Sequence, residues 1–156
     1  MRILVVGMGL IGGSICKSIK AATSHAVYGC DVQQAVLDDA IADGAIDGTG
    51  TMTDGTYDMI ILCLHQRIAI QMVQEALPKI PAGTILVDTC GLKGRMVRDL
   101  TYRCRKADVR YVGTHPMAGR EKNGYYASIP NLFQNANLIV TPVDGTDEAA
   151  LDAVKE

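Results

Sequence analysis

The stretch Gly7-Met8-Gly9-Leu10-Ile11-Gly12 carries three glycines at the spacing G-x-G-x-x-G. It follows Arg2–Val6, an apolar run that indicates a buried strand, and it leads into Leu10–Ala22, whose apolar residues have helical spacing. A glycine-rich turn between a strand and a helix is typical of the first βα unit of a nucleotide-binding parallel sheet. This turn therefore indicates the fold of the chain.

Each glycine has its own physical role in such a turn. Gly7 allows the tight turn, Gly9 lets a pyrophosphate approach the backbone, and Gly12 lets the helix pack closely against the sheet. The amino terminus of the helix then presents free N–H groups and a partial positive charge to the phosphates. The expected cofactor-binding residues of the turn are Gly7, Met8, Gly9, Leu10, Ile11 and Gly12.

A second feature of a dinucleotide site lies at Asp31, nineteen residues beyond Gly12 and directly after the expected strand Ala26–Cys30. An acid at this point binds the ribose hydroxyls of NAD and repels the 2′-phosphate of NADP. The segment Val32-Gln33-Gln34 offers no arginine to hold such a phosphate. The sequence therefore predicts NAD as cofactor. The alternative is a βαβ turn that binds no nucleotide.

Strands and helices alternate along the rest of the chain. Near-continuous apolar strands separated by amphipathic helices predict an α/β fold, a Rossmann-type doubly wound, mostly parallel sheet with helices on both faces. We expect residues 1–156 to form one NAD-binding domain. Because the last helical pattern runs to the final residue, we also expect a second domain after residue 156. Strands are expected at Arg2–Val6, Ala26–Cys30, Ala45–Asp47, Tyr57–Leu64, Thr84–Val87, Val109–Val112 and Asn137–Val140, and helices at Leu10–Ala22, Gln33–Ala42, Arg67–Leu77, Gly94–Lys106 and Asp147–Glu156.

The composition argues against several classes of partner. A formal net charge of −2 gives no electrostatic reason to expect nucleic acid or an anionic membrane. Every apolar run is shorter than the roughly 18 residues that a membrane span needs. The five cysteines are scattered, with no Cys-x-x-Cys pair, which argues against a disulfide framework or a zinc site. We expect a cytoplasmic protein, a reduced set of thiols and no bound metal.

A candidate catalytic residue lies in the stretch Gly113-Thr114-His115-Pro116-Met117-Ala118-Gly119. It follows the expected strand Val109–Val112, so His115 is expected at the carboxyl end of a strand, where open α/β sheets bind ligands. A histidine there can accept a proton near neutral pH. The alternative is a histidine that packs in the structure or caps a turn.

Three stretches together carry a family resemblance: Gly7–Ser14 (GMGLIGGS), Asp88–Gly94 (DTCGLKG) and Gly113–Gly124 (GTHPMAGREKNG). Over essentially the whole chain, the sequence resembles the nucleotide-binding domain of the prephenate/arogenate dehydrogenases. The resemblance implies an enzyme of tyrosine biosynthesis. That enzyme catalyses the NAD-dependent oxidative decarboxylation of prephenate to 4-hydroxyphenylpyruvate, or of arogenate to tyrosine. His115 matches the family's catalytic histidine, which bonds the ring hydroxyl of the substrate and draws off its proton.

The same resemblance implies roles for other residues near this site. Gly91 lies where the family usually has a serine that orients the histidine and touches substrate, so Cys90, Thr89 or a water would have to replace that serine. Glu121 matches the acidic residue of the family motif, where it orients the loop or pairs with a neighbouring base, or is a solvated charge. The family also has a helical second domain that supplies homodimer contacts and basic residues for the substrate side chain.

Position alone suggests three further residues. Lys93 and Arg95 begin an expected helix near the nicotinamide region and are candidates to attract substrate carboxylates, although charges there are often solvated. His65 follows the expected strand Tyr57–Leu64 and is a candidate for the nicotinamide ribose pocket, or it caps the next helix.

Two other functions remain open from the sequence. One is a different NAD dehydrogenase of the 3-hydroxyacid type, which shares the glycine motif but has no use for the segment around His115. The other is a non-catalytic NAD-sensing module, which Gly91 favours. If the chain is a prephenate or arogenate dehydrogenase, the expected partner is its small-molecule substrate.

Overall fold

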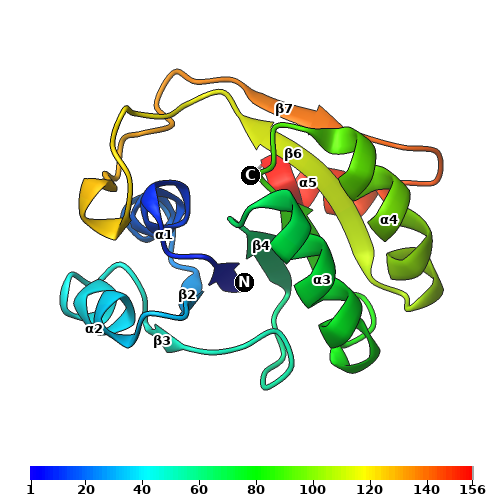
Figure 1. Cartoon of the computed structure of the whole chain (residues 1–156), viewed down its shortest axis with the longest axis horizontal. Helices are drawn as coiled ribbons and strands as arrows, with labels where there is room; N and C mark the ends of the chain where they lie inside the picture. Colours follow the sequence, from blue (N-terminus) through cyan, green and yellow to red (C-terminus); the bar gives the residue numbers. More distant parts are fainter. Residues whose placement is uncertain (156) are drawn as a thin grey trace.

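The computed structural model describes residues 1–155 and contains a single sheet with the strand order β3-β2-β1-β4-β5-β6-β7 (Figure 1). The first six strands are parallel, and β7 runs antiparallel to β6. Chain order reverses at β1, because β2 lies on one side of it and β4 on the other. The strands are β1 (Arg2–Val6), β2 (Ala26–Cys30), β3 (Gly48–Thr49), β4 (Met59–Leu62), β5 (Ile85–Asp88), β6 (Arg110–Pro116) and β7 (Leu138–Thr141).

Helices cover both faces of this sheet, which confirms the predicted fold class. One hydrophobic core unites the sheet with α1, α2 and α5, and a second core unites it with α3 and α4. Figure 1 shows α1 and α2 on one side of the molecule and α3 and α4 on the other. The helices are α1 (Leu10–Ala22), α2 (Gln34–Ala42), α3 (Gln66–Ala76), α4 (Lys93–Lys106) and α5 (Glu148–Lys155), with 3₁₀ turns η1 (Leu77–Lys79) and η2 (Tyr125–Ala127).

The apolar run of β1 explains why the sheet is covered twice. Ile3 and Val5 belong to the core beneath α1, whereas Leu4 and Val6 belong to the core beneath α3. All four side chains are buried, and each contributes roughly 1.5–3 kcal/mol relative to an exposed position. Successive side chains of a strand point to opposite faces, so both faces of a continuous apolar strand need a cover.

The third strand lies further along the chain than the sequence predicts. The predicted segment Ala45–Asp47 is not a strand, because the N–H groups of Ala45 and Ile46 both donate to the carbonyl of Ala40 and close the end of α2. The strand forms instead at Gly48–Thr49, which pairs with β2.

β6 is longer than predicted, and this changes the position of His115. Gly113–Pro116 pair with β7, so the strand continues to Pro116 rather than ending at Val112. His115, expected after the strand, therefore lies within it, opposite Ile139. β5 pairs with β6 from Arg110 to Gly113, and β7 alone pairs with the three residues beyond, Thr114, His115 and Pro116.

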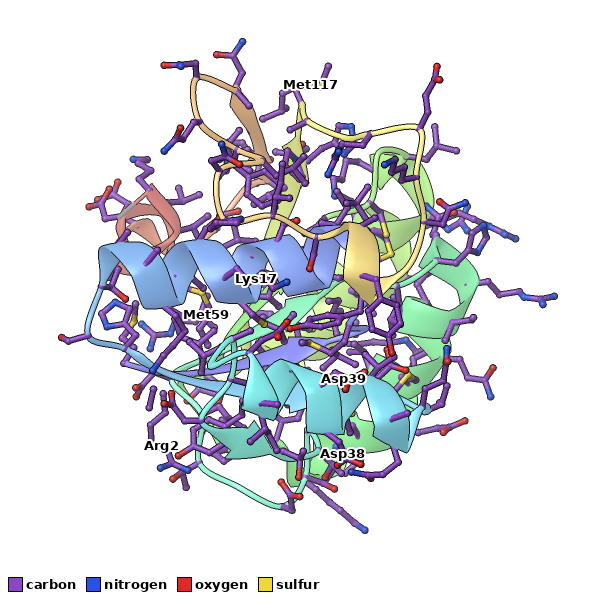
Figure 2. The ribbon with its side chains drawn as sticks, turned by 90° about the vertical axis from the view of Figure 1, so that its left-hand side faces the viewer. Arg2, Lys17, Asp38, Asp39, Met59 and Met117 are labelled. Carbon is purple, nitrogen blue, oxygen red and sulfur yellow. The ribbon has the colours of Figure 1, made fainter. Side chains whose placement is uncertain are left out.

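The connection from β6 to β7, residues 117–137, is here named the strap. It leaves the sheet, crosses to α1, and returns to β7 (Figure 1). Figure 2 looks onto α1 and α2 and shows the strap lying alongside α1 near Lys17. The Lys17 ammonium lies 4.5 Å from the centre of the Tyr125 ring, and the Ile129 N–H donates to Ser14 Oγ at 3.0 Å. The strap therefore links the His115 segment to the first helix.

Within residues 1–155, no helix has the length and apolar character needed to cross a membrane.

Candidate functional site

The glycine turn after β1 has the geometry that its sequence predicts. Gly7 has φ +94°, a conformation that other residues rarely adopt, and a Cβ there would lie 2.5 Å from the Cys63 carbonyl oxygen. A Cβ on Gly12 would lie 1.9 Å from the Gly7 carbonyl oxygen. In contrast, no atom lies within 4 Å of a Cβ built on Gly9. Gly7 and Gly12 are needed for packing, whereas Gly9 leaves open space.

The open space at Gly9 lies at the amino terminus of α1, which begins at Leu10 with Gly9 as its N-cap. The first N–H groups of a helix have no acceptor within the helix, and they carry its partial positive charge. The Gly9 carbonyl accepts the first helical bond, from Gly13, at 2.9 Å. Met8, although part of the motif, buries its side chain in the core, so a ligand can meet it through its backbone.

Asp31 is directed back toward this turn. Its Oδ2 accepts the N–H of Met8 at 2.8 Å, and its Oδ1 accepts the N–H of Gln33 at 2.9 Å. Each carboxylate oxygen has a second lone pair, so both can accept a further hydrogen bond from a ligand hydroxyl. Val32, next in the chain, is fully exposed. The turn and the acid therefore form one continuous edge at the carboxyl ends of β1 and β2.

His115 lies further along the same edge of the sheet and is half-buried. Its Nδ1 is 3.1 Å from the carbonyl oxygen of Thr89, in the turn that follows β5. A carbonyl oxygen accepts but does not donate, so this contact requires a proton on Nδ1. In the neutral ring Nε2 then carries no proton and is free to accept one, as a general base must.

The turn after β5 is organised by a buried carboxylate. Asp88 is fully buried; its Oδ1 accepts the Cys90 N–H at 2.9 Å and pairs with the Lys93 ammonium, while its Oδ2 accepts the Tyr111 hydroxyl at 2.7 Å. The Thr114 hydroxyl donates to the backbone carbonyl of Asp88 at 2.7 Å. β5 and β6 are thus joined by side chains as well as by their ladder.

Gly91 lies against the imidazole of His115. A Cβ on Gly91 would be 3.4 Å from Cε1 and 3.6 Å from Nε2 of the ring. The absent serine of the family pattern therefore leaves a space beside the histidine. Thr89, one of the residues expected to replace that serine, contacts the ring through its backbone carbonyl.

The remaining candidates lie near this edge with different surroundings. His65 is exposed at the N-cap of α3, where its carbonyl accepts the Ala69 N–H. Lys93 opens α4, but its ammonium is directed to Asp88, and its side chain is 13% exposed. Arg95 and Glu121 are exposed, and no ion pair of Glu121 occurs among residues 1–155.

The cysteines near the site are poor nucleophiles. Burial, as the main cause, raises the pKa of Cys63 to about 12 and that of Cys90 to about 11. Both thiols therefore stay protonated near neutral pH, whereas a nucleophilic cysteine must be a thiolate. In the described part of the chain, no group of three His, Cys, Asp or Glu side chains is arranged to hold a metal ion.

Several residues that organise the site are not evident from the sequence. Asp88 and Tyr111 are separated by 23 residues, and only the register of β5 and β6 brings them together. Gly13 follows the glycine motif, and a Cβ there would lie 2.8 Å from the Tyr125 ring of the strap. The double glycine Gly12-Gly13 indicates close packing on two sides of α1, since Gly12 contacts the turn and Gly13 contacts the strap.

Comparison with known proteins identifies one family over most of the chain. The family model described as "Prephenate dehydrogenase, nucleotide-binding domain" matches residues 15–156. The prephenate dehydrogenase of Lactococcus lactis is 31% identical over 144 residues, which cover 90% of this chain and 40% of that protein.

Two solved structures match the fold over nearly its full extent. The prephenate dehydrogenase of A. aeolicus, in complex with hydroxyphenyl propionate and NAD⁺, has a TM-score of 0.90 at 31% identity, covering 99% of this chain and 55% of that one. The arogenate dehydrogenase of Synechocystis has a TM-score of 0.88 at 26% identity, again covering 99% and 55%. The chain thus spans about half the length of the relatives that it matches.

Proposed function

The chain belongs to the family of prephenate dehydrogenase nucleotide-binding domains, and on this basis we propose that it is the NAD-binding part of an enzyme that oxidatively decarboxylates prephenate or arogenate. The observation that carries the proposal is the pairing of an open glycine turn with a histidine whose Nε2 is free, on one edge of one sheet. The relatives named for prephenate and for arogenate leave both substrates open.

The cofactor side of the proposal is supported by the turn itself. Gly9 leaves room for a pyrophosphate, and the first N–H groups of α1, from Leu10, Ile11 and Gly12, attract its charge. Asp31 would hold the adenosine ribose hydroxyls, and its carboxylate disfavours the additional phosphate of NADP. His65, exposed at the start of α3, would contribute to the nicotinamide ribose pocket. When bound, NAD⁺ supplies the acceptor for the hydride that leaves the substrate ring.

His115 would accept the proton of the ring hydroxyl at its Nε2. As the hydroxyl loses its proton and the same carbon loses hydride, that carbon becomes a carbonyl. The electron pair of the ring C–CO₂ bond then moves into the ring, CO₂ leaves, and a phenol forms after protonation. The Thr89 carbonyl would hold the imidazole in the required tautomer throughout.

Fewer residues of this chain are candidates to contact the substrate. The space beside Gly91 would admit the substrate ring or a water next to His115. Glu121 lies within the exposed part of the strap and would influence how that loop meets the substrate. Lys93 and Arg95 give the start of α4 a positive charge that favours carboxylates, with the Lys93 ammonium shared with Asp88.

We further propose a homodimer held by a helical second domain, which would also supply basic residues for the substrate side chain. A cytoplasmic location is supported by the five free cysteines, which a reducing compartment keeps as thiols. With a net charge of −2, neither nucleic acid nor an anionic membrane is a proposed partner.

The test is NAD⁺ reduction by the full-length protein, with prephenate and arogenate assayed separately and NADP⁺ as the alternative cofactor. Turnover of either substrate with NAD⁺ supports the proposal, and the ratio of the two kcat/KM values identifies the preferred one. Turnover of neither, with NAD⁺ still bound, would contradict it.

The variant His115→Asn separates an enzyme from a sensor. We expect kcat to fall by about 10²- to 10⁴-fold, the usual contribution of a general base, with the Kd for NAD⁺ unchanged. A cofactor-sensing module would instead bind NAD⁺ and show no response to the substitution in any assay.

A further inference from the structure

The carboxylate of Asp88 and the imidazole of His115 contact opposite ends of the same peptide group. That group joins Thr89 to Cys90. Its N–H donates to Asp88 Oδ1 at 2.9 Å, and its carbonyl oxygen lies 3.1 Å from His115 Nδ1. A continuous path of hydrogen bonds therefore runs from a buried carboxylate, through one amide, to the histidine.

We propose that Asp88 is a positioning residue, which holds His115 in the Nδ1–H tautomer by polarising the Thr89–Cys90 peptide. This inference rests on the proposed role of His115 as the proton acceptor. A negative charge at the N–H end of an amide increases the electron density on its carbonyl oxygen. Hydrogen bonds in such a chain strengthen one another, most of all where water is excluded. The polarised carbonyl is then a stronger acceptor for Nδ1–H, which leaves Nε2 free.

The surroundings of Asp88 fit a group that is held in one place. The carboxylate is fully buried, and three donors reach it: the Cys90 N–H, the Lys93 ammonium and the Tyr111 hydroxyl. Burial, and then the Asp88 charge, raises the pKa of Tyr111, so its hydroxyl keeps the proton that it donates. Three partners around one buried carboxylate hold it in a single orientation.

The same face of β6 is shaped to admit this arrangement. Tyr111, Gly113 and His115 are alternate residues of the strand and so point to one side. A Cβ on Gly113 would lie 3.5 Å from Asp88 Oδ2 and 3.3 Å from the Tyr111 hydroxyl. The glycine between the tyrosine and the histidine therefore lies directly against the carboxylate and the Lys93 side chain.

The tautomer of His115 can be measured by NMR spectroscopy without substrate. In full-length protein labelled with ¹⁵N-histidine, the ring signal of His115 is identified by its loss in His115→Asn. We expect the wild type to show the Nδ1–H form, and Asp88→Asn to shift His115 toward the Nε2–H form. Asparagine keeps the shape and an oxygen for the Cys90 N–H but removes the charge. A wild-type His115 already in the Nε2–H form would overturn the inference.

The kinetic effect should follow the spectroscopic one. We expect Asp88→Asn to lower kcat about tenfold, with KM changed less than twofold. Tenfold is the low end of the loss in activity when a hydrogen-bond partner that orients a functional histidine is removed. An unchanged tautomer together with an unchanged kcat would contradict a positioning role. If the wild type used neither prephenate nor arogenate, the proposed function would fail, and the tautomer measurement would still decide the role of Asp88.

Two variants separate this role from simple stabilisation. The single variant Asp88→Asn leaves the Lys93 ammonium without its partner, which can unfold the protein. The double variant Asp88→Asn/Lys93→Met removes both charges, so no buried charge is left unpaired. It should still shift the tautomer, whereas a wild-type tautomer would reduce Asp88 to a partner of Lys93 and overturn the inference. The matched control is Asp47→Asn. Asp47 also accepts a backbone N–H, from Val27, and pairs with a lysine, Lys20, but it directly precedes β3 and does not contact His115.

Discussion

The carbonyl oxygen of Gly7 lies 1.9 Å from the position that a Cβ on Gly12 would occupy. The two ends of the glycine turn are therefore in contact, and no side chain fits between them at Gly12. Neither group can move aside easily, because Gly7 is itself enclosed by the Cys63 carbonyl. This contact belongs to the backbone of the fold.

Gly12→Ala is expected to destabilise the protein by about 1–3 kcal/mol, since an added methyl group forces the backbone to shift. Gly9→Ala has open space and should change the free energy of unfolding by less than about 0.5 kcal/mol, while weakening NAD⁺ binding. Urea unfolding and a cofactor titration measure the two effects. Equal destabilisation by both variants would show that the turn is purely structural.

Gly91→Ser places a hydroxyl beside the imidazole of His115. We expect normal folding and an increase of about two- to tenfold in kcat/KM, because a serine hydroxyl at this position can bond the substrate beside Nε2, and one such hydrogen bond contributes about 0.5–1.5 kcal/mol. Gly91→Ala fills the same space without a hydroxyl and is the matched control. Equal rates for the serine and alanine variants, measured by NAD⁺ reduction, would rule out a gain from the hydrogen bond.

The strap offers a matched pair of tyrosines. Tyr125 is buried and donates to Oδ2 of Asp43, the C-cap of α2, at 3.0 Å, whereas Tyr126 is exposed and donates to Asp39 within α2. Tyr125→Phe should lower the free energy of unfolding by about 1 kcal/mol, because it removes a hydrogen bond to a carboxylate. Tyr126→Phe should lie within about 0.5 kcal/mol of the wild type. Urea unfolding of both variants decides whether the buried contact anchors the strap.

Stability should decline at alkaline pH. Burial, and next the Asp54 carboxylate, raises the pKa of Tyr57 to about 12 from an ordinary 10.0. Between these values the unfolded chain loses a proton that the folded chain keeps, so the free energy of unfolding falls as the pH rises. The contribution of Tyr57 is fully present below pH 10. Each pKa unit corresponds to about 1.4 kcal/mol.

Tyr57→Phe should flatten the alkaline decline, and Tyr102→Phe, at an exposed position, should leave it unchanged. Urea unfolding between about pH 9 and 12 measures the slopes. An identical slope for wild type and Tyr57→Phe would assign the decline to other groups.

Local patterns were sufficient to predict the alternation of strands and helices, the glycine turn and the acid after β2. These features depend on neighbours in sequence, so their period and spacing are visible in the chain. The predicted helix Leu10–Ala22 agrees with α1 at both ends. The roles of individual site residues remain predictions, since the comparisons concern the family and not single side chains.

The remaining features depend on contacts between distant residues. Ala45 and Ile46 have the apolar character of a strand, but they pack at the end of α2. The extension of β6 to Pro116 requires β7, whose pairing leaves no local pattern near His115. Likewise, Asp88 looks like an ordinary acid at the end of a strand until the register places Tyr111 beside it.

The strap is anchored on both sides of an exposed stretch. Residues 119–124 are exposed, β6 precedes them, and Tyr125 and Ile129 dock on α1 and α2 just after them. A break in this stretch would leave the two parts joined by the β6–β7 ladder and by the α1 contacts. The protein is therefore suited to fragment complementation. A piece ending near Gly119 and a piece beginning near Gly124 should reassemble. The first piece carries His115, and the second carries the part of the strap that packs on α1.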